Sequence, residues 1–283
     1  MNALELKDVS KHYGSFSLDN VSFVLPSGCI MGLVGENGAG KSTTIRLIMR
    51  AALPDSGTIM VLGQNNTAPT FRAVKEDIGI VLDEAYFPEV ITVKQVNIIM
   101  KNTYKRWDEA IFSGYIKQFD LPLDKAFKAF SRGMKMKLAI AVALSHAPKL
   151  LILDEATSGQ DPIMRDEILE IFSDFTRDEQ HSILISSHIL SDLEKLCDYI
   201  AFLHKGQLLF CSEKDRLMEE YGMLNITRAQ FEAIPSSAVC GCESSEYGVR
   251  CLVKRRDISS AFNVERASIE DIILFLAKGG RTK

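Results

Sequence analysis

Residues 35–42 of this 283-residue chain read Gly35-Glu36-Asn37-Gly38-Ala39-Gly40-Lys41-Ser42, which matches the pattern G-x-x-x-x-G-K-[ST] at each defined position. Small residues let a backbone wrap a chain of phosphates so that consecutive N–H groups point inward. Lys41 can reach the β- and γ-phosphates, and the Ser42 hydroxyl can ligate Mg²⁺. We therefore expect this loop to bind a nucleoside triphosphate, with Thr43 as a further contact.

The segments on either side of the loop match the structural context that the pattern requires. A short apolar run, Cys29 to Val34, predicts a buried strand before the loop. A helix is predicted from about Ser42 to Leu53, because apolar residues recur there at the spacing of one helical face. The positive end of its dipole would face the phosphates. A glycine-rich turn with a chance lysine explains this context less well.

Strand and helix signals alternate along most of the remaining chain. The first thirty residues alternate in hydrophobicity around a turn at Tyr13-Gly14, which is typical of antiparallel strands. Further strands are predicted at Thr58–Leu62, Ile78–Leu82, Leu150–Leu153, Ser182–Ser186, Tyr199–Leu203 and Leu208–Ser212. Strands that alternate with helices around a buried apolar strand predict an α/β fold with parallel strands.

We expect a P-loop NTPase core with an antiparallel β subdomain in residues 1–212. No strand signal occurs between about residues 84 and 148, so this segment is predicted to be a helical insertion into the core. Residues 213–283 are predicted to form a small α+β C-terminal subdomain whose last helix runs from Ser268 to Ala277.

Two carboxylates, Asp154 and Glu155, follow the apolar run Leu150–Leu153. This places them at the carboxyl end of a buried strand, where open α/β sheets bind their ligands. Asp154 suits Mg²⁺, directly or by orienting its ligands, and Glu155 can polarise a water that attacks the γ-phosphate. His188 follows another predicted strand, and from its position alone it could be a phosphate contact or a structural histidine.

Composition excludes several classes of protein. Hydrophobic residues make up 46% and the formal net charge is -4, so the chain is neither disordered nor basic enough to predict nucleic-acid binding. No apolar stretch approaches the roughly 20 residues that cross a bilayer, and the first residues lack a signal-peptide layout. Six scattered cysteines without a CxxC motif indicate reduced thiols in a cytosolic protein.

From about Leu4 to Ser212 the chain resembles the ATP-binding cassette family, the nucleotide-binding subunits of ABC transporters, because its motifs follow in the family's order. Tyr13 resembles the aromatic residue that stacks on adenine. The segment Phe130-Ser131-Arg132-Gly133-Met134 resembles the signature motif LSGGQ. By residue type alone, Ser131 is a good helix N-cap. The resemblance implies that Ser131 and Gly133 face the γ-phosphate bound to the opposite subunit.

Two further segments match family motifs. Ser158-Gly159-Gln160-Asp161 resembles the D-loop, which crosses the dimer interface, and His188 matches the switch histidine. The resemblance implies that two cassettes enclose two ATP molecules. It also implies that Glu155 activates water, that His188 holds the γ-phosphate, and that Lys41 with Mg²⁺ offsets the developing charge.

The sequence departs from the family pattern at three places. Asp83, followed by Glu84, occupies the position of the Q-loop glutamine. An acidic side chain there can ligate Mg²⁺ but adds negative charge near phosphates, so we expect an altered Mg²⁺ dependence. Arg132 and Met134 replace signature residues, and Gln160 replaces the commoner D-loop leucine.

The resemblance implies a Mg²⁺-dependent ATPase subunit that pairs with a separate transmembrane permease and with a second cassette, identical or similar. It also implies a cytoplasmic position on the inner face of the cell membrane. The single cassette, the acidic Q-loop position and the C-terminal extension look like exporter-type subunits for a drug, peptide or lipid-like substrate.

Two other functions fit parts of the sequence. A soluble cassette ATPase of translation or DNA repair usually carries tandem cassettes or a long coiled-coil insertion, and neither is present in these residues. A regulator that binds ATP without hydrolysing it is disfavoured by the set Asp154, Glu155 and His188. A phosphate-release assay distinguishes hydrolysis from binding alone.

Overall fold

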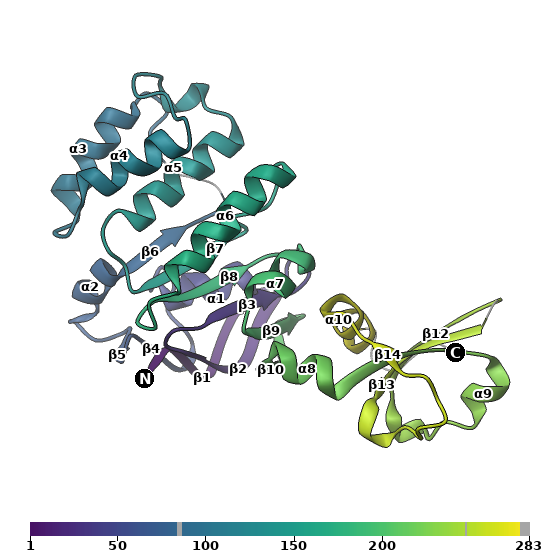
Figure 1. The fold of residues 1–283 in the computed structure, drawn as a ribbon. Coiled ribbons are helices and arrows are strands. Elements are labelled where there is room, and N and C mark those ends of the chain that lie inside the picture. The colour runs from purple at the N-terminus through teal and green to yellow at the C-terminus, as the bar shows by residue number, and fades with distance from the viewer. Residues whose placement is uncertain (84–86, 247, 278–283) are drawn as a thin grey trace.

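The computed structural model describes residues 1–83, 87–246 and 248–277 (Figure 1). Within these ranges, ten strands form one large sheet in the order β5-β4-β1-β2-β10-β9-β3-β8-β7-β6. Its strands are β1 (Asn2–Tyr13), β2 (Phe16–Pro26), β3 (Ile30–Val34), β4 (Ser56–Val61), β5 (Gln64–Asn65), β6 (Ile78–Val81), β7 (Leu150–Asp154), β8 (Ser182–Ser186), β9 (Tyr199–His204) and β10 (Gln207–Glu213).

Helices lie around this sheet, in a group above it, and beside the strands of the C-terminal part of the chain in Figure 1. They are α1 (Lys41–Ile48), α2 (Phe71–Val74), α3 (Val93–Thr103), α4 (Glu109–Gln118), α5 (Arg132–Leu144), α6 (Pro162–Phe175), α7 (Leu190–Leu196), α8 (Lys214–Glu220), α9 (Arg228–Glu232) and α10 (Ile269–Ala277). None of the helices in the described part of the chain is long and apolar enough to span a membrane.

The centre of the large sheet is parallel, as the sequence predicts. β3 pairs with β8 and β9, and β7 pairs with β6 and β8, all in parallel. Successive side chains of β7 enter opposite cores, with Leu150 and Ile152 on one face and Leu151 and Leu153 on the other. Because both faces are covered, the strand is apolar at every position before its terminal aspartate.

The N-terminal strands form the expected antiparallel part of the sheet, in which β1 pairs with β2 and with β4. Leu18 and Val21 are both fully buried although they are three positions apart. Asn20 lies between them with a φ of 47°, in the left-handed region. This local change of direction shifts the alternation of buried and exposed side chains along β2 by one residue.

The helix after the phosphate loop is shorter than predicted. α1 ends at Ile48, and Leu53 is exposed rather than part of a buried helical face. Arg50 has a φ of 55°, and the Asn66 side-chain amide donates to the carbonyls of Leu47 and Ile48. A buried side chain from a later loop therefore satisfies the last helical carbonyls. Each strand whose bounds were predicted after residue 30 ends within two residues of the observed strand.

The segment predicted to be helical contains α3, α4 and α5, which stand together above the sheet in Figure 1. The N-caps of these helices are Thr92, Asp108 and Ser131, and each side chain accepts a backbone N–H of the first turn. The N-cap predicted for Ser131 is confirmed, because its Oγ accepts from the Met134 N–H at 3.2 Å.

After β10, the chain forms a second sheet in the order β12-β13-β11-β14. Its strands are β11 (Tyr221–Ile226), β12 (Val239–Ser245), β13 (Gly248–Lys254) and β14 (Glu265–Arg266). Leu224, Cys251 and Val253 belong to a small core of this unit. Ile272 and Phe275 of α10 belong instead to the main core, so α10 packs the unit against the rest of the chain.

Candidate nucleotide-binding site

The glycines of the phosphate loop are required by its backbone. Gly40 has a φ of 113° and lies so close to β2 that a Cβ atom would stand 2.8 Å from Leu18 Cδ1. At Gly35 a Cβ atom would stand 2.5 Å from the carbonyl oxygen of Leu203. The loop therefore turns tightly between β3 and α1, against β9 and β2.

Lys41, the first residue of α1, is only 6% exposed. Its Nζ donates to the Gly35 carbonyl at 2.6 Å and lies 3.7 Å from Glu155 Oε1. A buried ammonium requires such partners because desolvation of an unpaired charge is costly. The loop therefore holds a positive charge at its centre, opposite the carboxylate of Glu155, which follows β7.

Most of the predicted site residues line a single hollow of about 360 Å³. The residues that line it are Phe16, Glu36, Asn37, Gly38, Gly40, Lys41, Ser42, Thr43, Asp83, Asp154 and Glu155. They come from the loop, from α1, from the start of β2, and from the end of β7 and the residues that follow β6 and β7. Gly35 and Ala39 are not among these lining residues, and Ala39 is buried.

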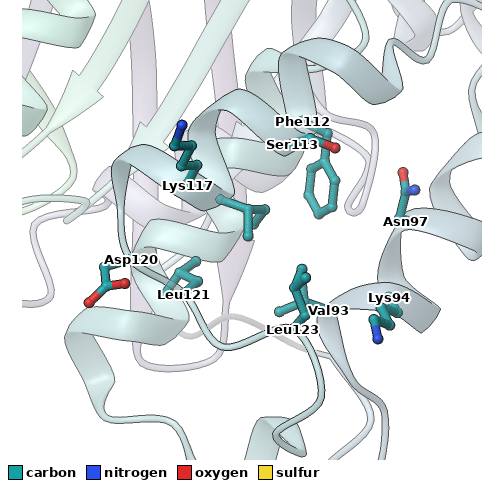
Figure 2. A pocket seen from close by; sticks show the side chains of 10 residues that line it. Val93, Lys94, Asn97, Phe112, Ser113, Lys117, Asp120, Leu121 and Leu123 are labelled. Atoms are coloured by element: carbon teal, nitrogen blue, oxygen red, sulfur yellow. The ribbon is translucent and has the colours of Figure 1, made fainter.

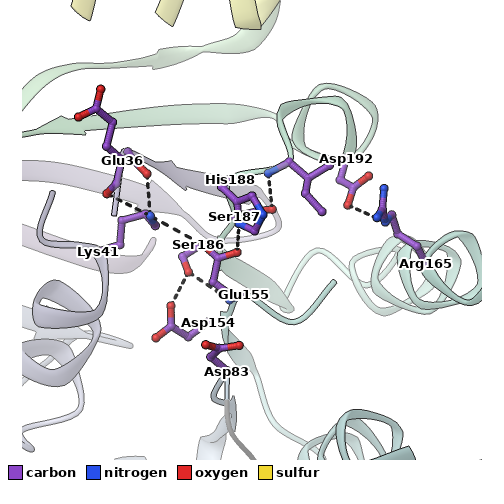
Figure 3. A network of polar contacts seen from close by, with 12 residues as sticks. Glu36, Lys41, Asp83, Asp154, Glu155, Arg165, Ser186, Ser187, His188 and Asp192 are labelled. Carbon is purple, nitrogen blue, oxygen red and sulfur yellow. Dashed lines mark hydrogen bonds and ion pairs between the residues drawn. The ribbon is translucent and has the colours of Figure 1, made fainter. Parts of the chain in front are cut away.

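Asp154 ends β7 and is buried. The Ser186 hydroxyl donates to its Oδ1 at 2.5 Å, and Ser186 Oγ also accepts from the Glu155 N–H (Figure 3). One serine at the end of β8 thus orients Asp154, the last residue of β7, and Glu155, which follows it. This is possible because β7 and β8 are adjacent parallel strands whose carboxyl ends meet, with Asp154 paired to Ser186.

Glu155 has a φ of 53°, in the left-handed region that residues other than glycine seldom adopt. Such a conformation costs on the order of 1 kcal/mol and is retained only where the surroundings demand it. The turn brings Glu155 Oε2 to 2.6 Å from His188 Nδ1, and Oε1 towards Lys41 (Figure 3). The structure thus brings together the three residues to which the sequence assigns catalysis.

Comparison with known proteins bears on the family. The profile of the family described as "ABC transporter" matches residues 18–158. The ABC transporter ATP-binding protein YtrB of Bacillus subtilis (strain 168) is 33% identical over 219 residues, which cover 77% of this chain and 74% of YtrB. The bacitracin transport ATP-binding protein BcrA of Bacillus licheniformis is 36% identical over 215 residues, which cover 73% of this chain and 68% of BcrA.

A solved structure agrees with these relatives. The "Structure of ATP binding subunit of ABC transporter" superposes with a TM-score of 0.67 at 29% identity, and covers 81% of this chain and 93% of that one. The chain belongs to the ATP-binding subunits of ABC transporters. Membership of the family implies ATP binding and hydrolysis by this ATP-binding subunit.

Besides Gly35 and Ala39, the predicted contacts that do not line the hollow of this ATP-binding subunit are Tyr13, Ser131, Gly133 and His188. Tyr13, at the end of β1, is 43% exposed, and its cross-strand partner Phe16 lines the hollow instead. Ser131 is the N-cap of α5 and Gly133 lies in its first turn, where a Cβ atom on Gly133 would stand 2.9 Å from Gln160 Oε1. The signature segment of this subunit therefore packs on residues 159–160.

The oxygen donors of the hollow fit Mg²⁺. Ser42, Asp83 and Asp154 line it together, and they also line an adjoining hollow of about 640 Å³. Mg²⁺ is usually bound by one or two carboxylates together with substrate phosphates and water. In the described residues no group of three or more His, Cys, Asp or Glu side chains could hold a metal, so phosphate oxygens would have to complete its coordination. Glu84, the other acidic residue noted in the sequence, lies outside the described residues.

Sequence reasoning missed three residues of this region. Phe16 was assigned only to a strand, and Ser186 was only the last residue of another strand. Arg132 was recognised as a departure from the signature, but its ion pair with Asp83 was not predicted: its Nη2 lies 2.5 Å from Asp83 Oδ1. A serine that ends a buried parallel strand beside an Asp-Glu pair is a signal that could have identified Ser186.

Proposed function

We propose that this chain is the Mg²⁺-dependent ATPase subunit of an exporter, and that it powers release of a drug, peptide or lipid-like substrate through a separate transmembrane permease. The observation that supports hydrolysis is the position of the Glu155 carboxylate, which lies between Lys41 Nζ at 3.7 Å and His188 Nδ1 at 2.6 Å. Binding alone does not require a carboxylate held beside the phosphate loop. The soluble cassette ATPase of translation or DNA repair is not favoured by the relatives.

In this proposal the chain's own groups divide the work. Lys41 and the loop N–H groups attract the phosphates, and the Glu155 carboxylate takes a proton from the attacking water. His188 orients Glu155 through Nδ1, while Nε2 on the other side of its ring would face the γ-phosphate. Mg²⁺ would be held by Ser42, Asp154 and Asp83 and would supply positive charge to the phosphate oxygens.

The permease is proposed to contact the helical insertion. A hollow of about 450 Å³ lies between α3 and α4 (Figure 2). Its walls include Val93, Phe112, Ile116, Leu121 and Leu123, and Lys94, Lys117 and Asp120 point away from its centre. Ile98 and Ile99 of α3 and Ile111 of α4 are exposed nearby. Exposed apolar side chains beside an apolar hollow support a protein contact at this face.

The exported class is proposed from the relatives. BcrA is named for bacitracin transport, and it shares 36% identity with this chain over 215 residues. Two cassettes, identical or similar, are proposed to act together, because the signature residues Ser131 and Gly133 do not line the hollow formed by the phosphate loop. Each nucleotide would then be completed by the signature segment of the other copy, at the inner face of the membrane.

The test uses the tagged full-length chain, isolated from membranes of the cells that carry it. We expect a membrane protein to co-purify and to stimulate phosphate release, and we expect EDTA to abolish that release. Ile98→Asp should lower the recovery of the membrane protein without lowering ATP affinity, whereas Lys195→Ala on α7 serves as a surface control. Recovery of ribosomes or DNA in place of a membrane protein would overturn the proposal.

A further inference from the structure

Asp83 and Arg132 form an ion pair between two segments that are separated in sequence by most of the helical insertion. Nη2 of Arg132 lies 2.5 Å from Oδ1 of Asp83. Asp83 follows β6 in the parallel sheet, and Arg132 is the first residue of α5. The two residues at which the chain departs most in charge from its family pattern therefore contact each other.

Asp83 adds a further carboxylate to the phosphate-loop hollow, which Glu36, Asp154 and Glu155 also line. Negatively charged side chains raise the free energy of polyphosphate binding, because like charges repel each other. Lys41 Nζ is already hydrogen-bonded to the loop and lies beside Glu155. Arg132 supplies a cation to Asp83 from a different part of the fold, and a guanidinium keeps its charge at any physiological pH.

The pair contributes little to folding stability. The Arg132 and Asp83 side chains are 56% and 50% exposed, and ion pairs at such positions are weak because water screens them. An effect on nucleotide binding is therefore separable from an effect on folding. It follows that variants at Arg132 and Asp83 should remain folded, which makes them suitable for a binding experiment.

Arg132 also contacts the segment after β7. A Cβ atom on Gly159 would stand 3.2 Å from Arg132 Nη1, and the φ of Gly159 is 69°. The guanidinium therefore lies between the end of β6 and residues 159–160. It joins the first turn of α5 to two loops that leave the carboxyl edge of the sheet.

We propose that Arg132 is a positioning residue for nucleotide binding within its own subunit. Its guanidinium neutralises Asp83 and holds that carboxylate at the hollow, so that the negatively charged nucleoside triphosphate binds without repulsion from an unpaired carboxylate. Binding thereby becomes sensitive to the position of α5, which carries the guanidinium. This inference rests on the proposed ATP binding at the loop.

The test is a double-mutant cycle on the full chain. Affinity for a fluorescent ATP analogue is titrated at several Mg²⁺ concentrations for wild type, Arg132→Ala, Asp83→Asn and the double variant. Arg132→Ala is expected to weaken binding about fivefold, the upper range for an exposed charge pair. In the Asp83→Asn background the same change should alter affinity less than about twofold. Arg132→Lys should retain most of the wild-type affinity that Arg132→Ala loses.

A matched control removes an equally short ion pair elsewhere. Arg106 Nη2 lies 2.5 Å from Asp77 Oδ1, and Arg106→Ala should leave nucleotide affinity unchanged. Equal losses from Arg132→Ala with and without the Asp83 carboxylate would overturn the inference, as would no loss in either background. A wild-type chain that binds no nucleotide would instead overturn the proposed function, and the inference with it.

Discussion

His188 Nδ1 lies 2.6 Å from Glu155 Oε2. An ionised carboxylate only accepts hydrogen bonds, so the hydrogen of this contact belongs to Nδ1. A neutral ring would then present a lone pair at Nε2. To donate to a γ-phosphate through Nε2, the ring must take up a proton or release Glu155. In the proposed site, a single hydrogen bond would therefore link nucleotide binding to the release of the Glu155 carboxylate.

Glu155→Gln should separate binding from turnover. The amide keeps the size of the side chain and can still accept from His188 through its oxygen, but it cannot take a proton from water. We expect kcat to fall at least about 100-fold while ATP affinity is retained. An ATP-bound dimer should then accumulate, measurable by light scattering. Glu170→Gln, on the exposed side of α6, is the control, and near-normal phosphate release by Glu155→Gln would refute the assigned role.

Lys41→Ala should act on binding. The buried ammonium is the positive centre of the loop, and hydrogen bonds to charged groups contribute about 1.5–3 kcal/mol. Affinity for the fluorescent ATP analogue should therefore fall at least about tenfold. Lys101→Ala, which breaks an exposed pair with Glu109, should leave affinity unchanged. Wild-type affinity in Lys41→Ala would contradict the site.

Ser186→Ala should lower both stability and turnover. It removes the donor to the buried Asp154 carboxylate and one of the two acceptors of the Glu155 N–H, the other being the Ser186 carbonyl, with an expected cost of about 1–3 kcal/mol in the free energy of unfolding. Ser182→Ala is the matched control, because Ser182 lies on the same strand and accepts from Gly28 far from the hollow. Thermal denaturation should show a lower melting temperature in both variants, whereas kcat should fall only in Ser186→Ala. Equal kcat values would contradict the orienting role.

His146 makes stability depend on pH. Burial lowers the pKa of its ring, against the opposing effect of the Ile78 and Val142 carbonyls. The unfolded chain, with a histidine pKa near about 6.5, then binds the proton more readily. The stabilisation is therefore present above about pH 6.5 and is lost as the pH falls, by at most about 1.4 kcal/mol per unit. The free energy of unfolding, measured by urea denaturation at pH values from 7.5 to 5.5, should fall less steeply with decreasing pH in His146→Gln than in wild type. An equally steep fall in the variant would be evidence against this effect.

Local patterns predicted much of the fold and part of the site. The loop at residues 35–42 and the Asp154-Glu155 pair were recognisable because each follows a short, fully apolar strand. Phe16 and Ser186 could not be assigned in this way, since their role depends on which strand lies beside them. The end of α1 was also misjudged, because the Asn66 side chain that satisfies its last carbonyls comes from a later loop.

The sequence by itself determined the phosphate loop, the buried strands and the family. These depend on residue type and short-range spacing, which locally favour strand, turn or helix. Only the tertiary structure decided that Glu155 contacts both Lys41 and His188, and that Arg132 neutralises Asp83. Such contacts join residues that are distant along the chain, and they form only when parallel strands align their carboxyl ends and α5 packs above them.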